Sequence, residues 1–555
     1  MTVGNNSAAD PWALPELKVE LGKPWREQTG REKLRTALLL VGKVGGVLGL
    51  MYVFVCSLDI MAQSFRLLGG RQAAEVFTNS KLLSNPVCGL MIGVLATVLL
   101  QSSSTSTSIV VTMVAADLLT VHLAIPIVMG ANIGTSITNT IVSGAHSADR
   151  DEFRRAFAGA TVHDMFNWLC VVILLPLEAA VGYLEKLSEA IVVNVPTGNG
   201  TQTTKPPQLL SVITKPLTKL IIQLDKGQIK AIALGKAGND SNFTLIKHLC
   251  KGQPCRHIFA ETSIPDAGVG ALLLVLSLVV LVFCLVSVVK LLNALLRGQV
   301  ALAIRRTVNS DFPPPFGFLT GYLAILMGAV LTVLVQSSSI FTSALTPLVA
   351  LGVLSLDRTF PLTMGANIGT TCTAVLAALA SRPEKLHDTL QIALCHLFFN
   401  ITGVLLWYPI PCLRSVPISL AKALGSQTAR YRWFALLYLF LVFALLPVFV
   451  FALSLAGEAV LLGVGGPLLA LLALVLAVNW AQQRMPQRLP VQLRSWAWLP
   501  RPLRSLEPMD ELITALLRPC RRRMRRVQPS ALELVASPST ASGIQKGDSD
   551  KPSLA

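Results

Sequence analysis

Charged residues are scarce in this chain of 555 residues. Asp, Glu, Lys and Arg make up 14% of it, whereas about a quarter of the residues in soluble globular domains are charged. Hydrophobic residues make up 52%, and they form long stretches such as Leu38–Leu58, Ala271–Leu292 and Phe434–Leu455. Each stretch can cross the hydrocarbon core of a bilayer, which takes about 20 apolar residues in a helix. The composition excludes a soluble domain and predicts an all-α polytopic membrane protein.

The sequence also lacks the signature motifs of zinc metalloproteases and of ATP-binding proteins with a phosphate-binding loop. The chain contains no His-Glu-x-x-His, the zinc-binding helix motif of metalloproteases, and no Gly-Lys-Ser or Gly-Lys-Thr of a phosphate-binding loop. Neither a zinc protease nor an ATP-driven pump is therefore indicated. We expect a protein that is not an enzyme and that uses no cofactor.

Basic residues outnumber acidic ones and give a net charge of +17. They gather just outside the apolar stretches, at Arg31–Arg35, Arg297–Arg306, Arg430–Arg432 and Arg518–Arg526. Lys and Arg in such positions mark the cytoplasmic ends of membrane spans. We therefore interpret the positive charge as a signal that orients the protein in the membrane. The expected partner of the protein is the lipid bilayer and not a nucleic acid. Both termini are expected to be cytoplasmic.

One long polar loop, roughly Val192–Thr262, interrupts the apolar pattern. Its three acceptor patterns for N-glycosylation begin at Asn199, Asn239 and Asn242. The loop also contains Cys250 and Cys255, a candidate disulfide pair. Both modifications belong to the non-cytosolic side of a membrane. The loop is therefore predicted to be extracellular.

One sequence unit occurs twice in the chain. Gln101–Ser104 and Gln336–Ser339 both read Gln-Ser-Ser-Ser, at an offset of 235 residues. The same offset places Met129–Thr135 on Met364–Thr370, and both read Met-Gly-Ala-Asn-Ile-Gly-Thr. Identical polar residues kept in one register over this distance identify an internal repeat.

The two copies are predicted to lie in opposite orientations in the membrane. The basic N-terminus is inside, and Leu38–Leu58 carries the chain out, so repeat one begins and ends outside. Ala271–Leu292 then returns the chain to the basic segment Arg297–Arg306, so repeat two begins and ends inside. Inverted repeats of this kind are typical of secondary transporters that work by alternating access.

Each Gln-Ser-Ser-Ser run breaks a hydrophobic segment and predicts a re-entrant helical hairpin with its tip at that run. Non-helical backbone at membrane depth survives only where it lines a cavity or packs on protein, so tips from opposite faces would meet near the midplane.

The predicted organisation is a cytoplasmic N-terminal segment (1–36), a first transmembrane helix (37–60), repeat one (85–178), the extracellular loop (190–265), a transmembrane helix (268–296), repeat two (317–411), two C-terminal transmembrane helices (433–480) and a cytoplasmic tail (481–555).

The tips offer hydroxyl and amide groups to a tetrahedral oxyanion. N–H groups freed at a helix break, together with the positive end of the helix dipole, also attract an anion. The candidate oxyanion-binding residues are Gln101, Ser102, Ser103, Ser104, Gln336, Ser337, Ser338 and Ser339. The same oxygens can ligate Na⁺, and helix packing by Ser and Thr is the structural alternative.

Fixed positive charge is missing from the tip segments. No Lys or Arg lies between Pro86 and Ala145, and between Gly321 and Ala380 the only one is Arg358, in a predicted connecting loop. Burying a divalent anion without a countercharge is very costly. We therefore expect a mobile Na⁺ to supply that charge, which would couple the binding of anion and Na⁺.

The Asn-Ile-Gly-Thr runs place Asn and Thr oxygens beside a glycine that permits a helix break or a close approach. A packing face of small residues is the alternative. The full set of candidate sodium-binding residues is Asp164, Asn167, Thr105, Asn132, Thr135, Asn367 and Thr370. The repeated histidines His163 and His396 are interpreted as helix-packing residues instead.

Asp164 is the one carboxylate in Phe157–Pro176, a predicted span of repeat one, and a carboxylate inside a membrane is a functional hypothesis by default. Its partner in the repeat is Leu397, so the carboxylate occurs in one repeat only. We interpret Asp164 as a cation ligand. The alternative is an ion pair near the helix end with Arg154 or Arg155.

With these residues in view, the chain resembles the vertebrate type II sodium-dependent phosphate cotransporters (solute carrier family 34). The resemblance covers about Leu38 to Val478. It rests on Gln-Ser-Ser-Ser-Thr-Ser-Thr-Ser at 101–108, Gln-Ser-Ser-Ser at 336–339, both Asn-Ile-Gly-Thr runs, Arg-Ala-Phe-Ala-Gly-Ala-Thr-Val-His-Asp at 155–164 and Ala-Arg-Tyr-Arg-Trp at 429–433. It implies Na⁺-driven uptake of inorganic phosphate at the plasma membrane, typically the apical membrane of epithelia, with both ions held at the paired tips.

Members of that family differ in the charge they move. Electrogenic members have Ala, Ala and Asp at three nearby positions, where electroneutral members have Ser, Ser and Gly. Ala158, Ala160 and Asp164 resemble the electrogenic pattern, which implies three Na⁺ with divalent phosphate. The tail is a candidate attachment point for a cytoplasmic scaffold protein, although it ends in Pro-Ser-Leu-Ala. Transport of another oxyanion such as sulfate, and an ion channel, are the alternative functions.

Overall fold

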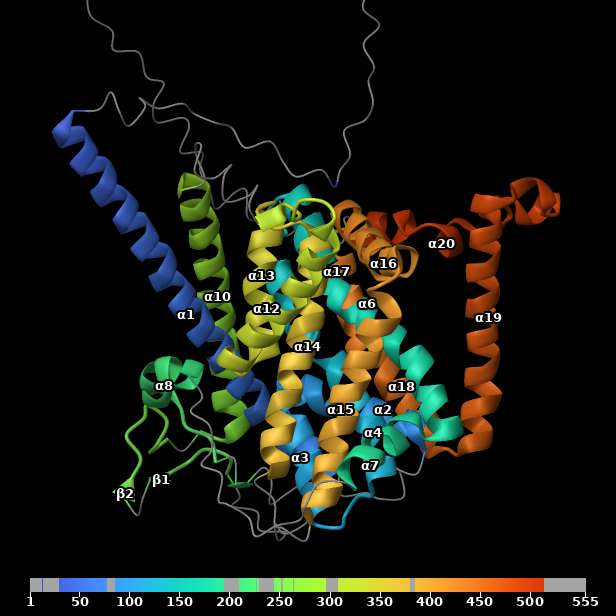
Figure 1. The fold of residues 1–555 in the computed structure, drawn as a ribbon, viewed down its shortest axis with the longest axis horizontal. Coiled ribbons are helices and arrows are strands. Elements are labelled where there is room, and N and C mark those ends of the chain that lie inside the picture. The colour runs from blue at the N-terminus through green and yellow to red at the C-terminus, as the bar shows by residue number, and fades with distance from the viewer. Residues whose placement is uncertain are drawn as a thin grey trace, which may run out of the picture. The chain divides into compact units, whose positions relative to one another are not determined.

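The computed structural model describes residues 12, 29–76, 85–193, 209–225, 227–228, 244–250, 253–262, 264–295, 308–379 and 385–513. Over these ranges the chain is almost entirely helical (Figure 1), and nine helices are long and apolar enough to cross a membrane. The prediction of an all-α polytopic membrane protein is confirmed. The chain divides after Pro467 into two compact units, each described by itself below.

The first helix, α1 (Gly30–Val76), extends past the end of the span predicted from hydropathy. It packs along α10 (Asp266–Leu295), and Figure 1 shows the two helices side by side. Phe54, Leu58 and Met61 are buried in a hydrophobic cluster with residues of α10. Their spacing of four and three residues places them on one face of α1, which is why the seam forms there.

Two helical hairpins form at the positions that the repeat predicts. Their arms are α2 (Pro86–Leu100) and α3 (Ser103–Ala115) in the first, and α12 (Leu319–Val335) and α13 (Ser338–Ala350) in the second. The 3₁₀ turn η3 (Phe316–Phe318) precedes α12. Each break falls between the Gln and the second Ser of a Gln-Ser-Ser-Ser run, as predicted. The re-entrant path of the hairpins through a membrane stays a prediction.

The helices that follow each hairpin pack in matching pairs. They are α4 (Val121–Gly134), α5 (Ile137–Gly144) and α6 (Arg150–Val181) after the first, and α14 (Leu356–Leu379) and α15 (Leu386–Trp407) after the second. The helix α2 packs against α4, and α12 packs against α14 in the same way. The second arm of each hairpin also contacts a helix of the other repeat: α3 contacts α15, and α13 contacts α6. Each hairpin is therefore held partly by the other half of the protein.

Glycine allows the first arms to approach their partner helices at van der Waals distance. A Cβ atom on Gly93 of α2 would lie 2.0 Å from the carbonyl oxygen of Ile127, and one on Gly328 of α12 would lie 2.2 Å from that of Leu362. Only glycine, which has no Cβ, fits so close to another backbone. Both pairs of positions differ by 235 residues, so the same contact recurs at the repeat offset.

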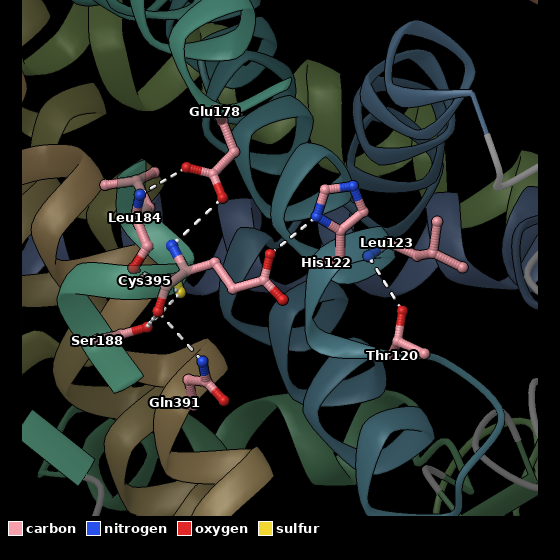
Figure 2. A network of polar contacts seen from close by, with 9 residues as sticks. Thr120, His122, Leu123, Glu178, Leu184, Ser188, Gln391 and Cys395 are labelled. Carbon is pink, nitrogen blue, oxygen red and sulfur yellow. Dashed lines mark hydrogen bonds and ion pairs between the residues drawn. The ribbon is translucent and has the colours of Figure 1, made fainter. Parts of the chain in front are cut away.

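The end of α6 is tied to the next helix, α7 (Tyr183–Val192), by a buried carboxylate. Glu178 accepts hydrogen bonds from the N–H groups of Leu184 at 2.5 Å and Glu185 at 3.2 Å, which caps the start of α7 (Figure 2). Gln391 of α15 in turn donates to the carbonyl oxygen of Glu185 at 3.2 Å. This network joins α6 and α7 to a helix of the second repeat.

The described part of the predicted extracellular loop is small. It comprises α8 (Leu209–Ile221) and an antiparallel hairpin of β1 (Leu249–Cys250) and β2 (Gln253–Pro254), in which Cys250 pairs with Gln253. The structure contains the predicted Cys250–Cys255 disulfide at the base of this hairpin. The predicted glycosylation acceptors Asn199, Asn239 and Asn242 lie outside the described residues.

The first unit ends with helices that pack against the repeats. They are α16 (Pro411–Arg430), α17 (Phe434–Phe440), the π-helical turn η5 (Leu441–Leu445) and α18 (Leu446–Leu455). The helix α16 packs along α6. It was not predicted, because its basic residues interrupt the apolar pattern.

The second unit begins inside α19 (Glu458–Arg484), the last long apolar helix among the described residues. It continues through short helical turns, η6 (Pro486–Arg488), η7 (Val491–Leu493), η8 (Trp496–Trp498) and α20 (Arg501–Arg504). The Trp496 indole N–H donates to Asn479 Oδ1 at 2.6 Å. This hydrogen bond holds the turns back against the end of α19.

Candidate functional site

The two hairpin tips have the same backbone geometry. Gln101 and Gln336 end the first arms in the left-handed conformation, with φ of 51° and 58°. Ser102 and Ser337 follow in extended conformation, and each hydroxyl accepts a hydrogen bond from the backbone N–H three residues further on, at 3.2 and 3.3 Å. A non-glycine residue in the left-handed region costs on the order of 1–3 kcal/mol and persists only where its surroundings fix it. Such strain is common at ligand sites.

A cavity of about 430 Å³ lies at the tips. The predicted phosphate-binding residues that line it are Gln101, Ser102, Ser104, Gln336, Ser337 and Ser339. The structure therefore brings most of the predicted set from both repeats to one place. Ser103 and Ser338 do not line the cavity; both are buried, each with 3% of its surface exposed.

Thr105 and Thr138 also line this cavity. The Thr138 hydroxyl donates to Gln101 Oε1 at 2.9 Å, which fixes the orientation of that amide. Because the first turn of an α-helix has N–H groups without an intrahelical acceptor, the starts of α3 and α13 add donors at the same end of the cavity. Hydroxyl, amide and backbone donors converging in this way suit an oxyanion.

The expectation of no fixed positive charge at the tips is wrong. Arg66 of α1 lines the cavity, and its Nε donates to the carbonyl oxygen of Leu100 at 3.1 Å. One terminal guanidinium nitrogen of the same residue donates to Thr105 Oγ1 at 3.4 Å. This charge comes from outside the tip segments, because Arg66 reaches the first tip from a helix that belongs to neither repeat.

Further charged residues line the outer part of the site. They are Lys215 and Lys219 of α8, Lys247 before β1, and the carboxylate Asp59 of α1. Together with Arg66 they give four positive side chains against one negative in the described lining. Gln63 Nε2 donates to Asp59 Oδ2 at 3.3 Å. The cavity is therefore electropositive, which favours an anion.

A buried network of asparagine and histidine side chains crosses between the repeats. Asn132 Oδ1 lies 3.1 Å from His396 Nε2, and Asn367 Oδ1 lies 2.6 Å from His163 Nε2. Asn367 Nδ2 also donates to Asn167 Oδ1 at 2.7 Å. Each repeated Asn thus contacts the His of the other repeat. These hydrogen bonds fit the packing role expected for the two histidines.

The predicted sodium-binding residues fall into separate places. Thr105 lines the tip cavity, while Asn132, Asn167 and Asn367 belong to the buried network. Thr135 and Thr370 each donate to a carbonyl oxygen of their own helix at 2.9 Å. Asp164 follows His163 directly in α6, but it hydrogen-bonds to Tyr438 and to no member of either group. The structure therefore does not gather the seven residues around one ion.

Asp164 is completely buried in α6. Its Oδ2 accepts a hydrogen bond from the hydroxyl of Tyr438 in α17, and among the described residues its Oδ1 has no partner. The alternative of an ion pair is excluded, because Arg154 pairs with Asp151 at 2.9 Å and Arg155 donates to the carbonyl oxygen of Ala350 at 2.8 Å. A carboxylate oxygen without a partner in a buried position can accept a cation.

Ala158 and Ala160 are buried in the same helix as Asp164. Ala158 faces α16, where a Cβ atom on Gly425 would lie 3.1 Å from the Ala158 Cβ. None of these three residues lines the tip cavity. Any influence on the charge moved is therefore exerted away from the tips.

A helical membrane protein whose two broken hairpins meet at an electropositive cavity belongs, as a class, with membrane transporters rather than enzymes. Comparison with known proteins makes the assignment specific. The sequence pattern of the family described as Na+/Pi-cotransporter matches residues 53–178 and 318–414, which contain both tips.

The chain is 51% identical to sodium-dependent phosphate transport protein 2B of Homo sapiens over 549 residues, which cover 91% of this chain and 78% of that protein. It is 53% identical to sodium-dependent phosphate transport protein 2A of Rattus norvegicus over 515 residues, or 88% and 80% of the two chains. No solved structure matches it. The chain belongs to the type II sodium-dependent phosphate transporter family, and it is a multi-pass membrane protein, not an enzyme.

Proposed function

We propose that this protein is a secondary active transporter that carries inorganic phosphate into the cell together with Na⁺ by alternating access. The observation that carries the proposal is the single electropositive cavity lined by both Gln-Ser-Ser-Ser tips. The relatives, which are sodium-dependent phosphate transport proteins, support the choice of both ions. The two pseudo-equivalent tips also suit a site that is exposed to either side in turn.

The anion is held by groups from both repeats. The hydroxyls of Ser102, Ser104, Ser337 and Ser339 and the free N–H groups at the starts of α3 and α13 donate to phosphate oxygens. The amides of the two glutamines complete the set, with the Gln101 amide oriented by Thr138. Ser103 and Ser338 support the tips from the buried side.

Sodium supplies the charge that the protein does not. Divalent phosphate carries two negative charges, and of the four positive side chains in the described lining only Arg66 hydrogen-bonds to a tip, so a bound Na⁺ is proposed to offset the remaining charge at the tips. Thr105, which lines the same cavity, is the proposed Na⁺ ligand beside the anion. Asn132, Asn167, Asn367, Thr135 and Thr370 are the proposed ligands of Na⁺ deeper in the protein.

Asp164 is the proposed ligand of an additional Na⁺. Its Oδ1, which has no partner among the described residues, and its complete burial support this role. Together with Ala158 and Ala160 it supports an electrogenic cycle of three Na⁺ with one divalent phosphate. One net positive charge would then enter the cell with each phosphate.

We further propose that the protein acts in the plasma membrane, in epithelia at the apical surface, with both termini cytoplasmic and the disulfide-bonded loop outside. The tail is the proposed attachment point for a cytoplasmic scaffold protein. Extracellular labelling of an epitope inserted into the loop, compared with one at either terminus, tests this topology directly. Labelling of a terminus in intact cells would contradict it.

The function is tested by uptake of radiolabelled phosphate in cells that produce the protein, with Na⁺ present or replaced by choline, under voltage clamp. We expect saturable uptake that requires Na⁺ and is accompanied by inward current. Equal uptake of radiolabelled sulfate would favour a broader oxyanion transporter. Currents far larger than the tracer flux accounts for would indicate a channel and refute the proposal.

A further inference from the structure

We propose that Arg66, which belongs to neither repeat, binds the transported oxyanion directly and sets the charge preference of the site. This inference rests on the proposed function, because it assumes that the tip cavity is the anion site. The residue comes from α1, which packs along α10 and whose second half reaches the repeats. The site would then consist of the two repeated tips and one positively charged side chain from outside the repeats.

The position of the guanidinium is fixed by the first hairpin. Its Nε donates to the carbonyl oxygen of Leu100, at the end of α2, and a terminal nitrogen donates to Thr105 Oγ1, in the first turn of α3. These two contacts hold the guanidinium across the helix break. Ser102 and Ser104, whose hydroxyls are proposed to bind phosphate, lie within the same break and line the same cavity.

The guanidinium also keeps binding capacity toward the cavity. Arginine has five N–H donors in a planar fork, and the two hydrogen bonds to the hairpin use only two of them. A fork of this geometry matches two oxygens of a tetrahedral oxyanion. Arg66 lines the cavity in which such an anion would lie.

No carboxylate of the described chain neutralises this charge at close range. The nearest candidate on the same face of α1 is Asp59, two turns earlier, and it accepts a hydrogen bond from Gln63. No ion pair within 4.0 Å joins Arg66 to an acidic residue among the described residues. Its positive charge is therefore available to an anion, whereas Arg154 and Arg358 are each paired with an aspartate.

A purely structural role is the competing explanation. Arg66 would then only fasten α1 to the end of α2, and its loss would lower the amount of working protein without changing anion affinity. The two explanations predict different effects on the KM of phosphate. They also differ in whether a positive charge at position 66 lowers that KM. Variants that separate charge from hydrogen bonding distinguish them.

The test compares Arg66→Gln, which keeps a donor but loses the charge, with Arg66→Lys, which keeps the charge but loses the fork. Arg256→Gln is the matched control, because it removes the same charge from an exposed arginine that does not line the cavity. Phosphate uptake is measured with saturating Na⁺ and normalised to the protein labelled at the cell surface. We expect the KM of phosphate to rise about tenfold or more in Arg66→Gln, clearly less in Arg66→Lys, and little in Arg256→Gln.

An unchanged KM in Arg66→Gln, or an equal loss of maximal uptake in both Arg66 variants without a change of KM, would overturn the inference. A second measurement does not depend on transport: inorganic phosphate should raise the thermal stability of the purified full-length protein but not that of Arg66→Gln. If the wild-type protein is stabilised by phosphate and shows no Na⁺-dependent uptake, the proposed function fails while the anion site stands. Equal stabilisation of both proteins would contradict the role of Arg66 alone.

Discussion

Replacing Asp164 should change the charge that accompanies phosphate without abolishing phosphate uptake. The carboxylate is completely buried, and its Oδ1 has no partner among the described residues. Asparagine has the same shape and keeps an acceptor for the Tyr438 hydroxyl, so Asp164→Asn removes the charge with the least disturbance. Glycine would instead leave that buried hydroxyl unpaired, at about 1–3 kcal/mol.

The expected magnitude follows from the charges involved. If three Na⁺ accompany one divalent phosphate, one net positive charge enters per cycle, and losing the Na⁺ held by Asp164 lowers this to zero. We therefore expect Asp164→Asn and Asp164→Gly to take up radiolabelled phosphate in a Na⁺-dependent manner with no phosphate-evoked current. Tracer uptake and current are measured in the same voltage-clamped cells.

Tyr438→Phe is the matched control, because it removes the hydrogen bond and keeps the carboxylate. It should retain about one charge per phosphate, since the ligand for the additional Na⁺ is intact. A ratio of one charge per phosphate in Asp164→Asn would refute the assignment of this residue. A ratio of zero in Tyr438→Phe would show that the tyrosine, and not only the carboxylate, is needed for coupling.

The structure makes further predictions at other positions. Gly93→Ala and Gly328→Ala should each prevent surface expression, because the added Cβ would lie about 2 Å from a carbonyl oxygen. Gly49→Ala is the control and should reach the surface normally, because no atom lies within 4 Å of the added Cβ. Surface biotinylation measures all three variants. Ser102→Ala and Ser337→Ala should each destabilise a helix start by about 1 kcal/mol and raise the KM of phosphate, and an unchanged KM in both would count against the tip site. Cys250→Ser should lower the free energy of unfolding of the loop by about 2 kcal/mol. It should have little effect on phosphate uptake, because neither Cys250 nor Cys255 lines the cavity. Loss of uptake at normal surface levels would instead indicate that the loop shapes the site.

The repeat made the hairpins predictable from the sequence. Because Gln101 and Gln336 interrupt apolar segments at the same register, the helix breaks could be placed to within a residue. The convergence of six tip residues on one cavity was also expected, since polar tips in a membrane need a common cavity. These features depend on local sequence that occurs twice.

Contacts between distant segments could not be predicted in the same way. Arg66 reaches Thr105 from a helix without a counterpart in the repeat, so no comparison of the two copies points to it. Tyr438, the partner of Asp164, lies 274 residues away. The sequence did pair His163 with His396, but only the packing of the two repeats shows that each contacts an asparagine of the other copy. The helix α16 was missed because Arg414, Lys422 and Arg430 break its apolar pattern.

Both tips and Arg66 are proposed to form one oxyanion site. This proposal is tested most directly by an experimental structure of the full-length protein determined with phosphate and Na⁺. We predict density for one tetrahedral anion in the tip cavity, within hydrogen-bond distance of Ser102 or Ser104, of Ser337 or Ser339, and of the Arg66 guanidinium. Phosphate bound elsewhere, or held by one tip without the other, would contradict the account.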